Sequence, residues 1–288
     1  MASDYLIEKK LKNEAPGLHR MAADTQAVLT QTLQSYRAVF PDYTDHSILH
    51  SLDVLNYCNH LIGEDQIDKV NADECYVLMM ACFLHDIGMG VKEKDFFEFM
   101  EELEGPDFAK KLKLSEIPVV TRDHHHELSG LYIRKYAAIF DIPSEDHLFA
   151  IIQTSRGHRK TDLYDEKEYP DIELPNGNVI RTAYLAALIR LSDEIDVASD
   201  RNPEILYDIN NVHDAYSKLC FEMHRIIKEV EISEDAVVLY TTDVPDVFMD
   251  FFNETVDKIE QTLGYCEAVV RTRTPFELHQ KHVVCRKR

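Results

Sequence analysis

Apolar residues recur along most of the chain at the three- and four-residue spacing that is typical of amphipathic helices. The densest apolar run, Tyr76–Leu84, predicts a helix that is buried on all sides. The whole pattern predicts helices at residues up to about 40, 46–62, 71–84, within 91–104, shortly after 105–106, from 122 to about 140, 144–157 and 181–192. The break at 41–45 offers Thr44 or Asp45 as the N-cap of the helix that follows.

Turn signals and β-branched residues predict the remaining elements. Arg159–Pro170 is polar and predicts a loop, while Asn176-Gly177 within Ile172–Ile180 predicts a tight hairpin. After Pro203 the pattern changes. We predict strands at 227–232 and 236–240, a helix at about 246–263, and strand-like runs at 268–271 and 283–285.

These elements predict a mainly α protein. We expect a helical domain at residues 1–202 and a small α+β module at 203–288. The chain stops directly after a strand-like run, which leaves open that the module is truncated and that the chain is a fragment of a longer protein.

The charge and the cysteines narrow the classes of function. With 31 Lys and Arg against 52 Asp and Glu, the formal net charge is -21, so we do not expect extended nucleic acid or an anionic membrane as a partner. An anionic substrate must then meet a local basic patch or a metal ion. The six cysteines show no CxxC spacing and lie mostly in apolar runs, and no signal peptide or membrane-length run is visible. We therefore expect reduced core cysteines and a cytoplasmic protein.

Candidate chemistry begins where the densest apolar run ends. His85 and Asp86 follow Leu84 directly, and Gly88 and Gly90 then stop the helix. Polar side chains buried without partners at this point would be costly, and a metal ion would remove that cost. The alternative is a His-Asp pair on the surface at a helix C-cap.

Other ligand-type residues also lie beside apolar helical runs. They are His50, His124, His125, His126, His158 and Asp193. Each alone has a plain alternative, as a helix-surface residue, a polar cluster or a turn cap. Together they suit a metal site in the core of a helical bundle. Imidazole with carboxylate favours Mn, Fe, Co, Ni or Zn over Ca, and five or six ligands with one shared Asp suffice for two ions.

The ligand order and its flanking residues resemble the HD superfamily of metal-dependent phosphohydrolases. The matching segments are His50-Ser-Leu-Asp-Val54, Phe83-Leu-His-Asp-Ile-Gly88 and Leu188-Ile-Arg-Leu-Ser-Asp-Glu-Ile-Asp196, within roughly residues 42–201. Members with two metals add histidines, which His125 (with His126 next to it) and His158 resemble. The resemblance extends to members that degrade nucleotides. It fails for cyclic-dinucleotide phosphodiesterases, because no glycine precedes Tyr169-Pro170.

This resemblance implies an HD-type helical domain and specific roles for its residues. One or two divalent ions would be held by His50, His85, Asp86, His125, His158 and Asp193. His85 and Asp86 would be catalytic, with Asp86 between two ions. Outer contacts to the ligands are expected from Asp53, Asp123, His126, Glu127 or Glu194. A basic island of Arg156, Arg159 and Lys160 beside His158 would bind substrate phosphate; the alternative is a solvated loop.

We therefore expect a phosphohydrolase that attacks a nucleotide, or a related phosphoester or phosphoanhydride, with metal-activated water. The alternative is a non-catalytic, regulatory nucleotide- or metal-binding module in a larger signalling or defence assembly. A nuclease for single strands is a third class, which the net charge disfavours. The expected partner is a small nucleotide, while homo-oligomers and additional domains stay open. The C-terminal module, with His213, His224, His279 and His282, is expected to carry no chemistry.

Overall fold

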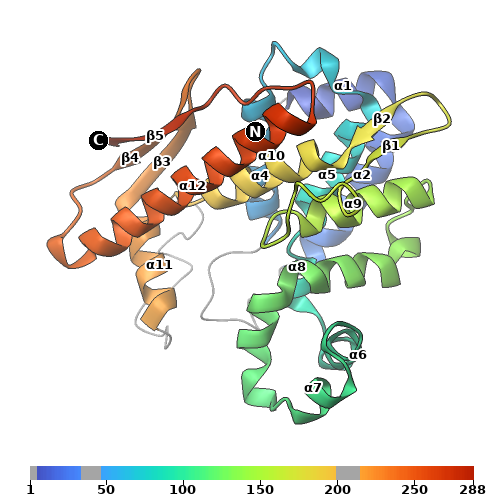
Figure 1. The fold of residues 1–288 in the computed structure, drawn as a ribbon, viewed down its shortest axis with the longest axis horizontal. Coiled ribbons are helices and arrows are strands. Elements are labelled where there is room, and N and C mark those ends of the chain that lie inside the picture. Colours follow the sequence, from blue (N-terminus) through green and yellow to red (C-terminus); the bar gives the residue numbers. More distant parts are fainter. Residues whose placement is uncertain (1–4, 34–46, 199–214) are drawn as a thin grey trace.

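The computed structural model describes residues 5–33, 47–198 and 215–288, and these form a bundle of helices with a small sheet at one end (Figure 1). The α-helices are α1 (Leu6–Glu14), α2 (Pro16–Leu33), α4 (Ile48–Ile62), α5 (Ala72–Leu84), α6 (Glu93–Glu104), α7 (Pro106–Lys111), α8 (Ile117–Lys135), α9 (Glu145–Arg156), α10 (Thr182–Ile195), α11 (Ala215–Ile226) and α12 (Met249–Arg273). The strands are β1 (Asp171–Glu173), β2 (Val179–Arg181), β3 (Ile227–Ile232), β4 (Ala236–Thr241) and β5 (His282–Lys287). Short 3₁₀-helices include η2 (Ile87–Gly90) and η4 (Ala137–Ile139). The predicted mainly α fold with a small α+β module is confirmed.

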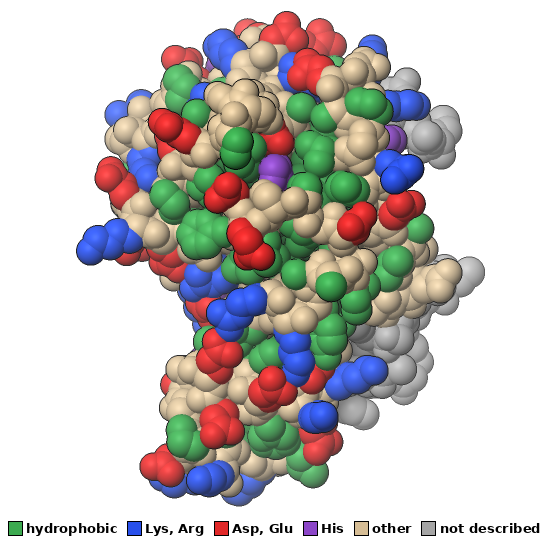
Figure 2. All heavy atoms as spheres, turned by 90° about the vertical axis from the view of Figure 1, so that its right-hand side faces the viewer, with side chains coloured by type: hydrophobic (Ala, Val, Ile, Leu, Met, Phe, Trp, Pro, Cys, Tyr) green, Lys and Arg blue, Asp and Glu red, His purple; other side chains and the backbone are tan. Residues whose placement is uncertain are grey.

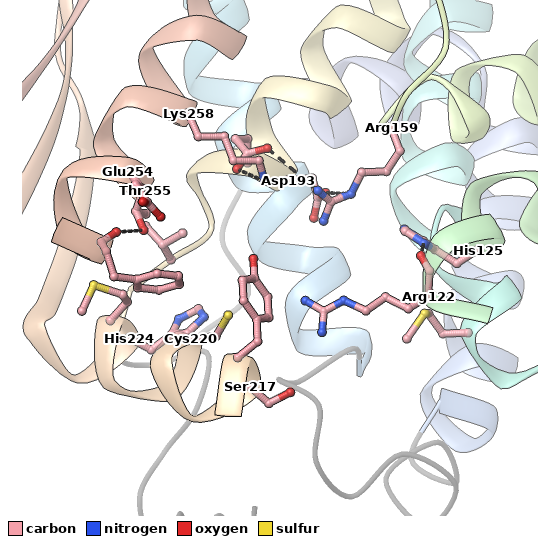
Figure 3. A pocket seen from close by; sticks show the side chains of 16 residues that line it. Arg122, His125, Arg159, Asp193, Ser217, Cys220, His224, Glu254, Thr255 and Lys258 are labelled. Atoms are coloured by element: carbon pink, nitrogen blue, oxygen red, sulfur yellow. Dashed lines mark hydrogen bonds and ion pairs between the residues drawn. The ribbon is translucent and has the colours of Figure 1, made fainter. Parts of the chain in front are cut away.

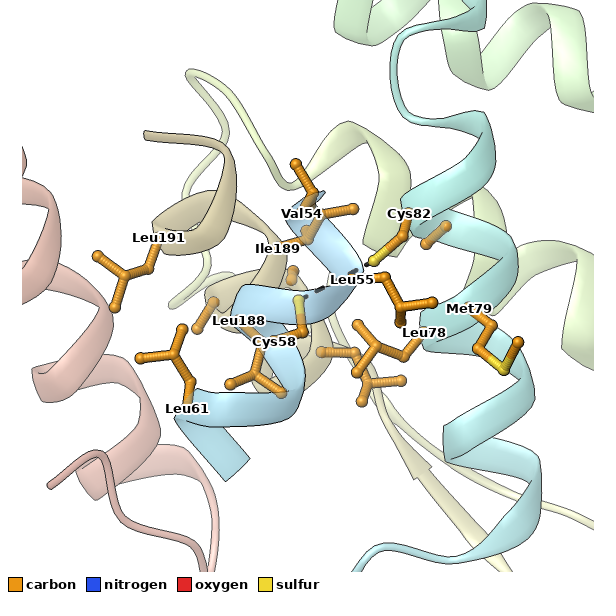
Figure 4. Close-up of a cluster of buried hydrophobic side chains, with 14 of the residues drawn as sticks. Val54, Leu55, Cys58, Leu61, Leu78, Met79, Cys82, Leu188, Ile189 and Leu191 are labelled. Atoms are coloured by element: carbon orange, nitrogen blue, oxygen red, sulfur yellow. Dashed lines mark hydrogen bonds between the residues drawn. The ribbon is translucent and has the colours of Figure 1, made fainter. Parts of the chain in front are cut away.

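Helix α5 lies at the centre of the bundle, and every residue of it is buried. Asn71 starts it with a capping box, in which its side chain accepts from the Glu74 N–H and the Glu74 carboxylate accepts from the Asn71 N–H. The helices α1, α2, α4, α9 and α10 pack around it. Leucine, valine and cysteine side chains fill the space between α4, α5 and α10 (Figure 4). The residues that follow α5 are therefore held in the middle of the molecule.

Two buried acids in the first turn of α5 attach neighbouring elements to it. The Asp73 carboxylate accepts hydrogen bonds from His147 Nε2 on α9 at 2.9 Å and from the side-chain amides of Asn176 and Asn178 at 3.0 and 2.6 Å. The Glu74 carboxylate accepts from Arg181 at 2.8 Å. Asn176 and Asn178 lie in the predicted hairpin, which β1 and β2 confirm, so this hairpin is fixed to the central helix.

A separate apolar cluster joins α6 to α8. It consists of Phe96, Phe99, Met100, Leu128 and Leu131. The α6–α7 segment projects from the bundle below α8 in Figure 1. On the face drawn in Figure 2, acidic, basic and apolar side chains are interspersed, although the chain as a whole carries a large negative charge.

The C-terminal module packs directly on the bundle. β3 and β4 form the predicted antiparallel hairpin, and β5 pairs with β4 in parallel. Helix α12 packs along α10, and Arg273 at its end donates to the backbone carbonyls of Leu163 and Tyr169 at 2.7 and 2.8 Å. The division predicted at residue 202 falls outside the described residues, so it stays a prediction.

Several predicted boundaries were wrong. Helix α8 starts at Ile117 rather than at Arg122, because Pro118 is favourable in a first turn, where its missing N–H is not needed. It ends at Lys135, and the separate turn η4 follows. Thr44 and Asp45 lie outside the described residues, but the N-cap of α4 is Ser47, whose side chain accepts from the Leu49 N–H.

The strand-like run 268–271 is also a correction, because it belongs to α12. Val269 and Val270 are fully buried on this helix. Their β-branched side chains favour a strand only weakly, and burial against the core outweighs that preference. The run at 283–285 does form a strand, β5.

Among the described residues, no single helix has the length and apolar character needed to cross a bilayer. Residues 72–90 and 93–104 meet that test only as a pair, and they are bent by 102° relative to each other.

We expect Asp73→Asn to lower the free energy of unfolding by about 2 kcal/mol at neutral pH. Hydrogen bonding from His147, with support from Asn178 and Asn176, lowers the pKa of Asp73 to about 2. This stabilisation is present above the unfolded-state value of 3.8 and is lost as the pH falls through about 2. Denaturant unfolding at pH 7 and pH 3 checks it, and the difference between wild type and variant should shrink at the lower pH. The exposed Asp68→Asn is the control; an Asp73 effect no larger than this control would contradict the account.

Candidate metal centre

Four ligand-type side chains from three helices meet in a first buried cluster. His50 of α4 and His85 at the end of α5 face each other, with their Nε2 atoms 3.1 Å apart. Asp86 Oδ2 lies 3.5 and 3.4 Å from these two nitrogens. Asp193 of α10 adds its Oδ1 at 3.3 Å from His50 Nε2. Two imidazole nitrogens and two carboxylate oxygens thus surround one point.

A second cluster shares Asp86 with the first. His125 of α8 and His158, which follows α9, place their Nε2 atoms 2.9 Å apart. The other carboxylate oxygen of Asp86, Oδ1, lies 3.7 and 3.6 Å from them. Each oxygen of one carboxylate therefore faces a different pair of imidazoles, and both groups are buried and close enough to hold a metal ion.

In each imidazole, a hydrogen bond from Nδ1 to an outer acceptor fixes the ring so that Nε2 faces inward. His85, His125 and His158 each direct Nδ1 at the backbone carbonyl three residues earlier, at 2.9, 2.6 and 2.6 Å. His50 directs Nδ1 at Asp196 Oδ2, at 2.6 Å. Because a carbonyl or carboxylate only accepts, Nδ1 carries the proton and Nε2 presents a lone pair.

This arrangement fits a divalent metal ion. Two neutral nitrogens that both present lone pairs at about 3 Å cannot hydrogen-bond to each other, and a cation bound between them would relieve this contact. Imidazole and carboxylate donors suit Mn, Fe, Co, Ni or Zn. The six inward side chains provide four nitrogens and two carboxylates, which is enough for two ions sharing Asp86.

Burial and neighbouring charges keep these residues in their ligand forms. Burial lowers the pKa of His125 to about 4. Burial, with His125 and His85 close by, holds the pKa of His158 well below its ordinary value. Burial alone would raise the pKa of Asp193, but the positive charge of Arg159 beside it keeps this pKa well below its usual range. At neutral pH the two imidazoles are therefore uncharged and Asp193 is ionised.

Glycines bring the ligand-bearing segments close together. A Cβ added to Gly88 would lie 2.4 Å from the carbonyl oxygen of His125, and the Gly88 N–H donates to Ser129 Oγ at 2.9 Å. A Cβ on Gly157 would lie 2.4 Å from the Cβ of Ala186. Only glycine permits these contacts, which place α8 against η2 and the end of α9 against α10.

Arg190 fixes the loop that carries His158 and Arg159, and sequence reasoning missed it. Its guanidinium donates to the backbone carbonyls of Gly157 at 2.7 Å, Arg159 at 3.2 Å and Thr161 at 2.8 Å. The signal was present in the sequence as a lone Arg in the apolar run 183–191. A charge at such a position needs buried partners.

The outer contacts differ from those predicted. Asp196, quoted only as the end of a matching segment, binds His50, and backbone carbonyls serve the other three imidazoles. Glu127 instead pairs with Arg156, and His126 lies 3.8 Å from Glu127. Glu194 pairs with Lys258 at 2.8 Å and lies 3.9 Å from Arg159. Asp123 lies beside exposed Lys160, at 3.5 Å.

The structure separates the three members of the predicted basic island. Arg156 forms a paired hydrogen bond with Glu127 and an ion pair with Glu168 at 2.8 Å, so its charge is already balanced. The Lys160 side chain is 64% exposed. Arg159 alone of the three turns toward the ligands, with its Nε 3.6 Å from Asp193 Oδ2. Within the described residues, this buried Nε has no hydrogen-bond partner.

A protein-family model described as HD-CE matches residues 40–267. The chain belongs to the HD-CE family. The match confirms the resemblance to HD proteins, and it continues past residue 201 into α12, beyond the motifs that suggested it. Comparisons with curated proteins and with solved structures gave no match.

A cavity of about 250 Å³ opens beside the metal centre of this HD-CE protein (Figure 3). Its wall includes the candidate ligands His125 and Asp193. Arg159 lines it, as do Arg122 and Lys258, two basic residues that sequence reasoning did not select. Neither Arg156 nor Lys160 is among its lining residues. The far wall comes from α11 and α12, so the C-terminal module lies beside the site. That this module carries no chemistry stays a prediction.

We expect the HD-CE chain to bind up to two transition-metal ions, and Asp86→Ala to lose most of this metal because both clusters share the carboxylate. Elemental analysis after purification without chelator checks it. The exposed Asp107→Ala should retain wild-type metal content. Equal metal in wild type and Asp86→Ala would mean that the clusters do not bind ions.

Acid should release the metal. Bound imidazoles must be unprotonated, free histidine has a pKa of about 6.5, and burial lowers that of His125 to about 4. We therefore expect occupancy to hold at neutral pH and to fall through mildly acidic pH as protons compete for the Nε2 lone pairs. Dialysis at stepped pH followed by metal analysis measures this. A metal content that does not change with pH over the whole range in which the chain stays folded would contradict histidine ligands.

Proposed function

We propose that this HD-CE protein is a metal-dependent phosphohydrolase that acts on a nucleotide or a related phosphoester or phosphoanhydride. The observation that carries the proposal is the Asp86 carboxylate, whose two oxygens face two separate imidazole pairs. Paired ions at such a site suit displacement at phosphorus, because they stabilise the attacking and the leaving oxygen together.

The side chains would divide the work. When bound, divalent ions supply Lewis acidity and lower the pKa of water toward neutrality. His50, His85 and Asp193 would hold the first ion, and His125 and His158 the second, with Asp86 between them. The Nδ1 hydrogen bonds keep each ring in its orientation. Arg159 has its Nε 3.6 Å from Asp193 Oδ2, without a hydrogen bond among the described residues, and would bind a phosphate oxygen through a charge-assisted hydrogen bond.

Local charge supports a small anionic substrate. The chain as a whole repels anions, but Arg122, Arg159 and Lys258 line one small cavity beside the ligands. Asp193, Glu194 and Glu254 line it as well, and Lys258 pairs with Glu194, so bound metal ions together with Arg159 would supply the positive charge for a single phosphorylated molecule. A long nucleic acid strand would also meet the acidic surface, so the proposal does not extend to nucleases. Because the six cysteines are free, we also propose a cytoplasmic location.

The rival is a regulatory module that binds a nucleotide or metal without turnover. The complete set of inward donors, four imidazoles and two carboxylates, favours the enzyme, since a sensor does not need two adjacent ion sites. A screen of nucleoside mono-, di- and triphosphates for release of phosphate or pyrophosphate, with Mn, Fe, Co, Ni or Zn bound, decides between them. Asp86→Ala provides the blank. No turnover at full metal occupancy would leave the regulatory module.

Arg159→Ala should raise KM by roughly ten- to a hundredfold if the contact to phosphate is equal in ground and transition states. A fall in kcat would place the contact on developing charge instead. Lys160→Ala, a change at the next residue, should have little effect, because Lys160 does not line the cavity. Steady-state kinetics with metal content checked in each variant measures this. Equal effects of the two variants would count against a specific role for Arg159.

A further inference from the structure

The cavity beside the metal centre has two chemically different ends. Figure 3 shows Arg122, His125 and Arg159 reaching in from one side, and His224, Cys220 and Thr255 from the other. The first side holds the candidate ligands and basic groups. The second side belongs to α11 and α12, which also contribute Met223 and Phe251. The cavity therefore runs from a charged end at the metal centre to a more apolar end in the C-terminal module.

Aromatic groups form part of the C-terminal end. The Tyr216 ring is 51% exposed and packs edge-to-face with Phe251, with ring centroids 5.8 Å apart. The guanidinium of Arg122 lies 5.0 Å from the centre of the Tyr216 ring. Both a tyrosine ring and a guanidinium plane can stack on another flat ring. These residues thus offer flat surfaces within the cavity.

Acceptor groups lie next to these rings. Thr255 Oγ1 donates its proton to the Phe251 carbonyl at 2.8 Å, so the hydroxyl oxygen can accept a hydrogen bond. The Glu254 carboxylate, which lines the same wall, accepts only. A flat group that carries N–H donors complements this end.

The size of the cavity limits what it can hold. Its volume of about 250 Å³ corresponds to roughly eight water molecules. This suits a base and sugar rather than an oligonucleotide.

We propose that α11 and α12 form the subsite for the nucleoside part of the substrate, with an amino-bearing base beside Tyr216 and Phe251 and the phosphate at the metal centre. The proposal rests on the proposed function, because the phosphate is what orients the molecule along the cavity. It gives the C-terminal module a direct role in substrate selection. The family match, which extends to residue 267 and so covers α11 and most of α12, is consistent with the module being part of the site.

Calorimetric titration of the metal-loaded full chain with AMP, UMP and inorganic phosphate tests the subsite. AMP should bind roughly tenfold or more tightly than inorganic phosphate, because only the nucleotide reaches a stacking surface. UMP, whose base has no amino group, should bind more weakly than AMP. Tyr216→Ala should weaken AMP binding by roughly 5- to 100-fold and leave phosphate binding unchanged.

Tyr164→Ala is the matched control, since Tyr164 is 41% exposed but does not line the cavity. Phe251→Leu is a milder second variant, used if Tyr216→Ala also loses metal or melts early; it should weaken AMP but not phosphate. AMP and phosphate binding equally well, UMP matching AMP, or Tyr216→Ala and Phe251→Leu both binding AMP as wild type does, would each overturn the proposal.

These outcomes are separable from the proposed function. If the metal-loaded chain hydrolyses no nucleotide but shows the expected binding pattern, the hydrolase proposal fails and the subsite stands. If hydrolysis is found and neither variant affects AMP binding, the subsite is wrong and the hydrolase proposal stands.

Discussion

The structure depends on four buried nitrogen lone pairs that converge on one carboxylate. Nδ1 of each imidazole faces an outer acceptor, which turns Nε2 of His50 toward Nε2 of His85 and Nε2 of His125 toward Nε2 of His158. A water molecule has too few protons to donate to this many acceptors, and burial opposes protonation of the imidazole rings. A bound cation would satisfy all of these ligand atoms together, and the packing of α4, α5, α8, α9 and α10 holds them at that separation.

Much of this site was predictable because its ligands follow local sequence rules. A polar pair at the end of a wholly apolar helix, as at His85 and Asp86, has few explanations in a folded core. The outer contacts were not predictable. Three are made by backbone carbonyls, which leave no trace in side-chain type. The fourth, Asp196, depends on how the end of α10 lies against α4. Arg156 was misleading because its partners, Glu127 and Glu168, are distant in sequence.

The fold was predicted best where periodicity was strong and worst where long-range packing decided the outcome. The central helix and both hairpins follow from apolar runs and turn residues. Val269 and Val270 favour a strand locally, yet they lie in a long helix because α12 packs on α10. The same packing of α12 on α10 brings the C-terminal module to the cavity, a relation that no local pattern contains. The family match across residues 40–267 extends over most of α12 as well as the bundle.

The close contact at Gly88 sets the distance between η2 and α8. A methyl group there would lie 2.4 Å from the His125 carbonyl, whereas ordinary contact begins near 3.4 Å, so α8 would have to retreat by about an ångström. Metal–ligand distances tolerate only about 0.2 Å. The distance at which α8 packs on η2 thus sets the distance between the two imidazole pairs. A larger side chain at position 88 would therefore move His125 relative to Asp86 by more than the ligands of a bound ion would tolerate.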